Sequence, residues 1–356
     1  MPYYYEQLNK EQQRAYHAMK EGLSSMAPSF PVPRLSDREL ADIYFLLRLD
    51  HPKLFYSVKF SYKFYPESEN VEMVPEYLFK KNKLMDHQKA MEARVKKLAR
   101  QAEKLSDKDK ELFIHDFICQ NVRYDKLKKA YSHEIIGPLG QGVGVCEGIA
   151  KSVKILCDAL NIWCIIAISG ANPEKGIKYR HAWNIVRIDG KYYHLDATFD
   201  NSLGDPEEIR HDYFNLNDKQ IFRDHEPVIW KVPVCEDGSH TYYQEKKVSF
   251  TKYEDVRKRS MQAAKKGKKL VFQWRGSYLT KEVLNELSLA TSSLIKIISG
   301  GKASTFEYKE LIILDLSAGV ATLRLELTQE RKSNITTKYI SSIRIPMELA
   351  LYVIEI

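Results

Sequence analysis

Apolar and polar positions in the first third of the chain follow helical spacing and strand spacing in turn. Residues 36–39 read Ser-Asp-Arg-Glu, a capping-box pattern that starts helices, and apolar residues follow at helical spacing as far as Leu47. We expect this helix to cover about 13 residues and to end before Asp50-His51-Pro52. Segments 55–65 and 71–77 are rich in aromatic and β-branched residues and flank a polar stretch, which predicts a β-hairpin.

The next stretch carries one apolar stripe on an otherwise charged segment. Its apolar residues recur at intervals of four and three positions: Met91, Val95, Leu98, Ala102 and Leu105. The stripe predicts a long surface helix packed on a neighbour, because it is too short for a coiled coil. Ser106 can cap a further helix, whose apolar residues are Leu112, Phe113, Phe117 and Ile118.

The length of the chain predicts more than one core. At 356 residues with 44% hydrophobic content, it can bury two or three. We predict an N-terminal accessory region at 1–105, a motif-bearing domain at 106–243 and a small C-terminal α/β domain at 244–356. In the last region the pattern favours helices at 252–266 and 280–288 and strands at 269–274, 306–315 and 319–328, without a chemical motif.

Charge and cysteine content narrow the class of protein. The formal net charge is +8 and the basic residues are spread along Lys-rich segments, which favours solubility over a nucleic-acid-binding stripe. The N-terminus has no signal-peptide pattern, and no segment approaches the ~18 apolar residues of a membrane span. We therefore expect a cytoplasmic protein, while an exported form stays open if a leader precedes this sequence. Five sparse cysteines argue against a disulfide framework, so at least one is expected to be free.

Cys146 has a setting that differs from that of the other cysteines. Gly142 and Gly144 precede it, and apolar residues follow at helical spacing from Ile149 to Leu160, which places Cys146 at or within one residue of a helix N-terminus. The unpaired N–H groups and the positive dipole end there can stabilise a thiolate and hold an oxyanion. A free cysteine is more often a buried small apolar residue. We expect that role for Cys119, Cys157, Cys164 and Cys235.

Asp189-Gly190 is a strong hairpin signal between two apolar segments, 180–188 and 191–198. If these two residues form the turn, the register pairs residues on one face as follows: His181 with Thr198, and Trp183 with Asp196. His181 and Asp196 are then diagonal neighbours, close enough for a hydrogen bond between imidazole and carboxylate. A bulge in the turn would shift the register by one residue and break this geometry.

Histidines offer an alternative chemistry. A metal hydrolase could draw its ligands from four residues: His181, His194, His211 and His225. The sequence has no His-Glu-x-x-His and no paired Cys-x-x-Cys spacing, so we expect neither a metal nor another cofactor. His194 is interpreted as a structural residue.

Three motifs, taken in order, are similar to those of the transglutaminase-like superfamily. They are Gly-Val-Gly-Val-Cys-Glu-Gly-Ile-Ala-Lys at 142–151, Arg-His-Ala-Trp-Asn at 180–184 and Tyr-Tyr-His-Leu-Asp-Ala-Thr-Phe-Asp at 192–200. Segments 211–215 and 223–225 also resemble bacterial members, and the resemblance covers about 110–230. It implies an α+β, papain-like core in which a helix bearing the cysteine packs on a small antiparallel sheet bearing the histidine and the aspartate, with accessory regions on both sides.

The resemblance also implies roles for these residues. Cys146 would be the nucleophile, His181 the base and Asp196 the orienting acid for acyl transfer at an amide through a thioester. The backbone N–H of Cys146 is the expected oxyanion donor, and Gln141 is a candidate second donor. Trp183 is a candidate substrate contact, although packing beside the His–Asp pair is favoured.

The expected substrate is a peptide or protein, and water is favoured over an amine as the acyl acceptor. Two alternatives stay open. One is a protein-glutamine transglutaminase, and the other is a binding or scaffold protein that keeps the fold without turnover. Membership of such a superfamily indicates the site chemistry better than the substrate.

Overall fold

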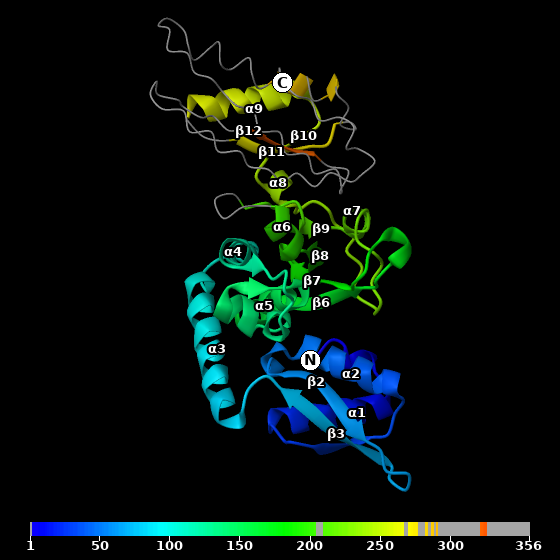
Figure 1. Ribbon diagram of the computed structural model, residues 1–356. Coiled ribbons are helices and arrows are strands. Elements are labelled where there is room, and N and C mark those ends of the chain that lie inside the picture. Colours follow the sequence, from blue (N-terminus) through cyan, green and yellow to red (C-terminus); the bar gives the residue numbers. More distant parts are fainter. Residues whose placement is uncertain are drawn as a thin grey trace, which may run out of the picture.

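The computed structural model describes residues 2–203, 209–266 and 270–276, five further positions between 282 and 290 (282, 283, 286, 287 and 290), and residues 321–325. Figure 1 shows an N-terminal region in blue, a central region in cyan and green, and a C-terminal region in yellow and orange. The central region carries the three motifs, and the N-terminal region shares an apolar core with it.

The N-terminal region is a three-stranded antiparallel sheet with helices beside it. Its strand order is β1-β3-β2. The elements are a 3-10 turn Tyr5–Gln7, α1 (Lys10–Ser24), β1 (Phe30–Pro33), α2 (Asp37–Asp50), a 3-10 turn Pro52–Leu54, β2 (Ser57–Lys63) and β3 (Asn70–Tyr77). The Ser36 hydroxyl accepts from Glu39 N and the Glu39 carboxylate accepts from Ser36 N, so the predicted capping box is confirmed. The predicted hairpin is confirmed as β2 and β3, whereas α1 and β1 were not expected.

Two helices lead into the central region: α3 (Lys81–Ala102) and α4 (Asp107–Asn121). The predicted stripe on α3 is buried as far as Ala102, but Leu105 lies beyond the helix end and is 41% exposed. Ser106 caps α4 as predicted. Of the four apolar residues named for this helix, Ile118 is buried and the other three are half-buried. The fully buried residues are Glu111, Ile114, His115 and Ile118, because Asn215 and Asp200 supply hydrogen-bond partners for the two polar members of this face.

The central region packs α5 (Cys146–Ala159) on a four-stranded antiparallel sheet, which confirms the α+β, papain-like expectation. The strand order is β6-β7-β8-β9. The sheet strands are β6 (Trp163–Ser169), β7 (His181–Ile188), β8 (Lys191–Leu195) and β9 (Phe214–Leu216); the remaining elements are β4 (Arg123–Tyr124), β5 (Val143–Gly144), short turns Ala130–His133, Gly137–Gln141 and Pro173–Lys175, and α6 (Ala197–Leu203).

The β7–β8 hairpin has the predicted turn. Asp189 and Gly190 both have positive φ, 50° and 81°, as a two-residue hairpin turn requires. The strands pair from Ile188 with Lys191 to Asn184 with Leu195. The pairing stops there, so the two predicted pairs beyond it do not form. The chain instead turns into α6, and the Asp196 carboxylate accepts hydrogen bonds from the N–H groups of the first turn of that helix.

The C-terminal region has a small mixed sheet. Strand β11 (Leu270–Trp274) pairs in parallel with β10 (Ser249–Phe250) and antiparallel with β12 (Ala321–Leu325). Helices α7 (Asp218–Ile221) and α8 (Tyr242–Glu245) precede β10, and α9 (Tyr253–Lys265) lies between β10 and β11. The predicted helix 252–266 and strand 269–274 correspond to α9 and β11. Only parts of the predicted helix 280–288 and strand 319–328 are described, and the predicted strand 306–315 lies outside the described residues.

One apolar core runs through the N-terminal and central regions, from Ala15 to Phe214. A separate core, which includes Phe272 and Trp274, belongs to the C-terminal region. The three domain boundaries stay a prediction, because a shared or separate core does not by itself define an independently folding unit. No helix in the described part of the chain is long and apolar enough to cross a membrane.

Candidate active site

Cys146 is the first residue of α5, as predicted. Val145 precedes it in extended conformation, and no side chain caps the helix, so the N–H groups of the first turn are free to face a ligand. Gly142 has a φ of 65°, and a Cβ atom on Gly148 would lie 2.2 Å from the carbonyl oxygen of Ser132. The first turn of α5 therefore lies directly against the neighbouring chain segment. This close packing fixes the position of the half-buried Cys146.

His181 lies between Cys146 and Asp196. Its Nε2 atom is 2.6 Å from Asp196 Oδ2, and its ring also forms a side-chain hydrogen bond with Cys146. Because Nε2 faces the carboxylate, Nδ1 is the nitrogen left for the sulfur. Burial lowers the pKa of His181, but the Asp196 charge and the two hydrogen bonds outweigh it and raise the pKa to about 10. The imidazole is thus set to be cationic at neutral pH.

Asp196 is fully buried, and four hydrogen bonds satisfy its carboxylate. Oδ1 accepts from Thr198 N and Phe199 N, while Oδ2 faces His181 and, at 2.9 Å, His225 Nε2. Burial raises the pKa of Asp196, but the His181 charge and the hydrogen bonds from both histidines hold it well below its usual range. The carboxylate therefore stays ionised beside His181.

His225 is a second imidazole at this site. Its Nδ1 atom is 2.6 Å from Asp224 Oδ1, and Asp224 Oδ2 in turn accepts from the Tyr213 hydroxyl at 2.5 Å. Burial lowers the pKa of His225, but Asp196 and Asp224 raise it above its ordinary value. The sequence patterns pointed to His225 only as a metal ligand. The resemblance of segment 223–225 to bacterial members was the available signal.

Of the two other predicted site residues, Trp183 is buried beside His181 and Gln141 is exposed. The Trp183 indole is 1% exposed, stacks on His181 with ring centroids 5.8 Å apart, and donates to His194 Nδ1 at 2.9 Å. His194 in turn contacts Asp218, which agrees with its structural interpretation. The geometry favours packing over substrate contact for Trp183. Gln141 is exposed at the end of the 137–141 turn, and its oxyanion role stays a prediction.

Tyr124 borders the site, which the sequence patterns did not indicate. It lies on β4, pairs in parallel with Gly144 two residues before Cys146, and is 39% exposed. Partial burial raises the pKa of Tyr124, and the nearby Cys146, Asp125 and Asp196 raise it further. Its hydroxyl stays protonated at neutral pH and can donate a hydrogen bond at the edge of the site.

A second Cys–His–Asp arrangement differs from the candidate site in the position of its cysteine. Cys119 Sγ is 3.7 Å from His115 Nε2, which lies 3.1 Å from Asp200 Oδ2. Cys119 lies within α4 rather than at a helix N-terminus, and burial raises the pKa of its thiol. This cysteine therefore stays a neutral thiol, as expected for a structural residue.

Three clusters of described residues have metal-ligand chemistry: His115–Asp116–His211, His181–Asp196–His225 and His194–Asp218–Cys235. In each cluster the imidazoles already form hydrogen bonds with carboxylates.

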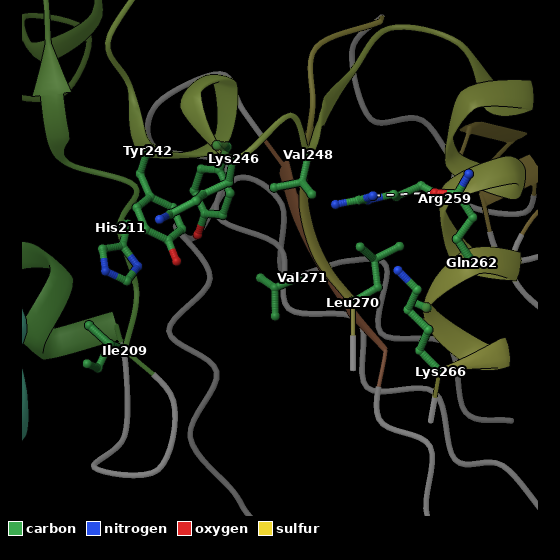
Figure 2. A pocket seen from close by; sticks show the side chains of 12 residues that line it. Ile209, His211, Tyr242, Lys246, Val248, Arg259, Gln262, Lys266, Leu270 and Val271 are labelled. Atoms are coloured by element: carbon green, nitrogen blue, oxygen red, sulfur yellow. Dashed lines mark hydrogen bonds between the residues drawn. The ribbon is translucent and has the colours of Figure 1, made fainter. Parts of the chain in front are cut away.

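A cavity of about 450 Å³ lies elsewhere in the molecule. Figure 2 shows His211 and Tyr242 on one side of it, and Arg259, Gln262 and Lys266 of the α9 segment on the other. None of the three predicted catalytic residues lines this cavity. The candidate site is instead a partly exposed surface site at the N-terminus of α5.

Comparisons with known proteins agree with the geometry. Residues 95–197 match the family model of the transglutaminase-like superfamily. The matched segment includes Cys146, His181 and Asp196. No curated protein matches the chain.

Three solved structures are similar to part of the chain, each over 40% of its length. One is described as a TGase, at 14% identity over 44% of that chain with a TM-score of 0.26. The second, from Cytophaga hutchinsonii, is described as a candidate cysteine protease, at 16% identity over 62% with a TM-score of 0.26. The third, from Parabacteroides distasonis, is described as a candidate protease, at 14% identity over 37% with a TM-score of 0.24. The chain thus spans less than two thirds of each of these structures.

Proposed function

We propose that this protein is a cysteine hydrolase that cleaves peptide or amide bonds through a thioester on Cys146. One observation carries the proposal: His181 uses Nε2 to contact Asp196 at 2.6 Å and keeps its other nitrogen for the thiol at the N-terminus of α5. This is the arrangement in which an aspartate orients the imidazole that activates a nucleophile.

The reaction starts from the pair in which the proton of the Cys146 thiol has already passed to His181, so that a thiolate faces an imidazolium. The thiolate attacks the carbonyl carbon, and the negative charge on the carbonyl oxygen forms near the free N–H groups of the first turn of α5. When the C–N bond breaks, the proton on His181 passes to the leaving amine. The acyl group then remains on the sulfur as a thioester. His181 takes a proton from water, the resulting hydroxide attacks the thioester, and the acid is released with the thiol restored.

Two carboxylates near the nucleophile have separate tasks. Asp196 stabilises the His181 cation. Glu147, next to Cys146, would oppose a negative sulfur, but Lys151 Nζ lies 2.7 Å from its carboxylate and Arg48 lies 3.7 Å from it. Because these two cations neutralise Glu147, the helix N-terminus keeps its preference for negative charge.

Water is the proposed acyl acceptor because the site is open to solvent. His181 is 19% exposed and Tyr124 is 39% exposed. A transferase must exclude water and pre-position an amine with a high effective molarity, since water is present at ~55 M. The alternative acyl acceptor is an amine, as in a protein-glutamine transglutaminase.

The test is to trap the acyl-enzyme. We would incubate the protein with a peptide library, quench it in acid, and identify any acyl group on Cys146 by intact-mass and peptide mass spectrometry. The expected result is an adduct on Cys146 that disappears with time as shortened or deamidated peptides are released. The C119S variant is the matched control and should behave like wild type, whereas C146S should form no thioester. Incorporation of a fluorescent amine without any hydrolysis product would overturn the choice of water as acceptor.

A further inference from the structure

Two exposed segments lead directly into the candidate site. Residues 123–129 start at β4, where Tyr124 pairs with Gly144, and residues 175–180 run into His181 at the start of β7. The first segment thus borders Cys146 and the second borders its base.

The two segments contact each other. Lys128 Nζ lies 3.3 Å from the ring centroid of Tyr179, which is 66% exposed. Asp125 shapes the first segment, because its buried carboxylate accepts hydrogen bonds from Leu127 N and Lys129 N. The segments therefore form one continuous edge beside the site. We call it the basic rim and define it by its cations: Lys126, Lys128, Lys129, Lys178 and Arg180.

The basic rim has an excess of positive charge. All five cations are exposed, and none of them forms an ion pair with a carboxylate of the described residues. Two acids beside the rim have partners of their own: the Asp125 carboxylate accepts hydrogen bonds inside its own turn, and Glu226 pairs with Lys175 at 2.6 Å. A group of cations without carboxylate partners favours an anionic ligand.

Arg180 is exposed and contacts two aromatic rings. Its guanidinium carbon lies 5.7 Å from the Trp230 ring centroid and 5.9 Å from that of Phe45, which belongs to α2 of the N-terminal region. Phe45 and Trp230 stack on each other and pack against the same apolar cluster as Cys146. A guanidinium that lies over aromatic rings keeps its N–H groups available for a carboxylate.

Apolar side chains are interleaved with these cations. Leu127 is 77% exposed, Tyr179 is 66% exposed, and both lie next to rim lysines in the sequence. Exposed apolar residues beside a site favour binding of a chain that offers side-chain contacts as well as charge. A peptide fits this combination better than a small inorganic anion does.

We propose that the basic rim binds the carboxylates of an acidic peptide segment, and that the acyl donors of this protein are peptides with glutamate or aspartate next to the reacting amide. The proposal rests on the function proposed above for the choice of a reacting amide. The binding surface itself can be tested without turnover.

The first test measures the local charge at Cys146. We would compare the alkylation rate of Cys146 by iodoacetate, which is anionic, with the rate by iodoacetamide, which is neutral. In the variant K126Q/K128Q/K178Q the ratio of the two rates should fall roughly three- to tenfold, the combined size expected of several exposed charge interactions. The matched control K81Q/K89Q/K97Q removes the same charge from α3 and should leave the ratio unchanged. An equal ratio in both variants would overturn the proposal.

The second test measures peptide binding. A glutamate-rich acetylated peptide and its counterpart with every glutamate replaced by glutamine would be used to protect Cys146 from iodoacetamide. The acidic peptide should protect at least about tenfold better at low salt, and this advantage should shrink at high salt and in R180Q. Equal protection by both peptides refutes the acidic-substrate proposal, even if peptides are hydrolysed. Selective protection without any hydrolysis supports the basic rim and refutes the proposed reaction instead.

Discussion

His225 Nε2 lies 2.9 Å from Asp196 Oδ2, the same oxygen that faces His181. The carboxylate behind the candidate base is therefore shared by two imidazoles, and the second of them is anchored by Asp224 on its other side. Because the two imidazoles compete for one oxygen, substitutions at Asp196 and at His225 should have opposite effects on the charge of His181.

Replacing Asp196 with Asn should lower kcat by about 10³- to 10⁴-fold, the loss seen when a triad loses its orienting anion. Asn can still accept the hydrogen bonds from Thr198 N and Phe199 N, so the start of α6 should survive. Steady-state kinetics and circular dichroism would check both parts. A D196N variant that turns over at the wild-type rate would remove Asp196 from the mechanism.

The pH dependence should report the charge on His181. Its pKa is raised to about 10, so kcat/KM should fall as the pH rises through that value and the imidazolium is lost. The contribution of His181 to stability has the same sign, because a raised folded-state pKa gives stability that is complete below about 6.5 and is lost as the pH approaches 10. In D196N the alkaline limb should move down toward 6.5. An alkaline limb that does not move in D196N would show that another group controls it.

Replacing His225 with Gln should move the alkaline limb in the opposite direction. The glutamine amide can still donate to Asp196, but the substitution removes a positive charge that competes with His181 for the same oxygen. We expect the pKa of the alkaline limb of kcat/KM to rise by roughly half a pH unit to one pH unit, with kcat reduced less than about tenfold. The titratable groups that face His225 are Asp196, Asp224, Tyr213 and the His181 and His194 rings. A downward shift in H225Q would contradict this positioning role.

The sequence predicted the hairpin well and the position of Asp196 less well. Asp189-Gly190 favours the two-residue turn so strongly that the pairing as far as Leu195 could be derived from it. The end of β8 could not be derived in this way. Asp196 does not pair with β7 but caps α6, a helix that has no strong apolar pattern of its own. The His181–Asp196 contact survives because both the predicted and the observed backbone keep the two residues near each other.

Long-range contacts were beyond what periodicity can indicate. His225 contacts Asp196 across 29 positions of the sequence, and a contact at this separation depends on tertiary packing. Arg48 is a similar case, since it lies within the apolar run of α2 and only its position among leucines hinted at burial. Its partners Glu134 and Glu147 lie in other elements and could not be named from spacing.

Replacing Arg48 with Met should destabilise the protein by about 3–5 kcal/mol, the typical cost of removing one partner from a buried ion cluster. Glu134 and Glu147 would then share Lys151 as their remaining close lysine or arginine partner among the described residues. Urea unfolding would measure the loss. The control is R38A, because Arg38 is 93% exposed and its contact with Asp42 is 3.9 Å long, so its effect should stay within about 0.5 kcal/mol. Equal stabilities for R48M and R38A would contradict a structural role for this cluster.

Replacing Gly148 with Ala should impair the site more than the fold. In a helix, Ala is favoured over Gly by about 1 kcal/mol, so propensity alone predicts stabilisation. Against this, the added Cβ would lie 2.2 Å from the Ser132 carbonyl oxygen, and a backbone atom cannot move away as a flexible side chain can. Overpacking of this kind costs about 1–3 kcal/mol, so the clash should outweigh the propensity.

The clash in G148A should also push the first turn of α5 away from its neighbour and shift Cys146, two residues earlier, relative to His181. We expect slower alkylation of Cys146 by iodoacetamide and a loss of turnover, both measured beside G170A. That control adds the same methyl group at an ordinary contact distance of 3.5 Å from Ile229 Cγ2, so it should behave like wild type. If G148A alkylates at the wild-type rate, the close packing of α5 on the Ser132 segment does not set the position of the nucleophile.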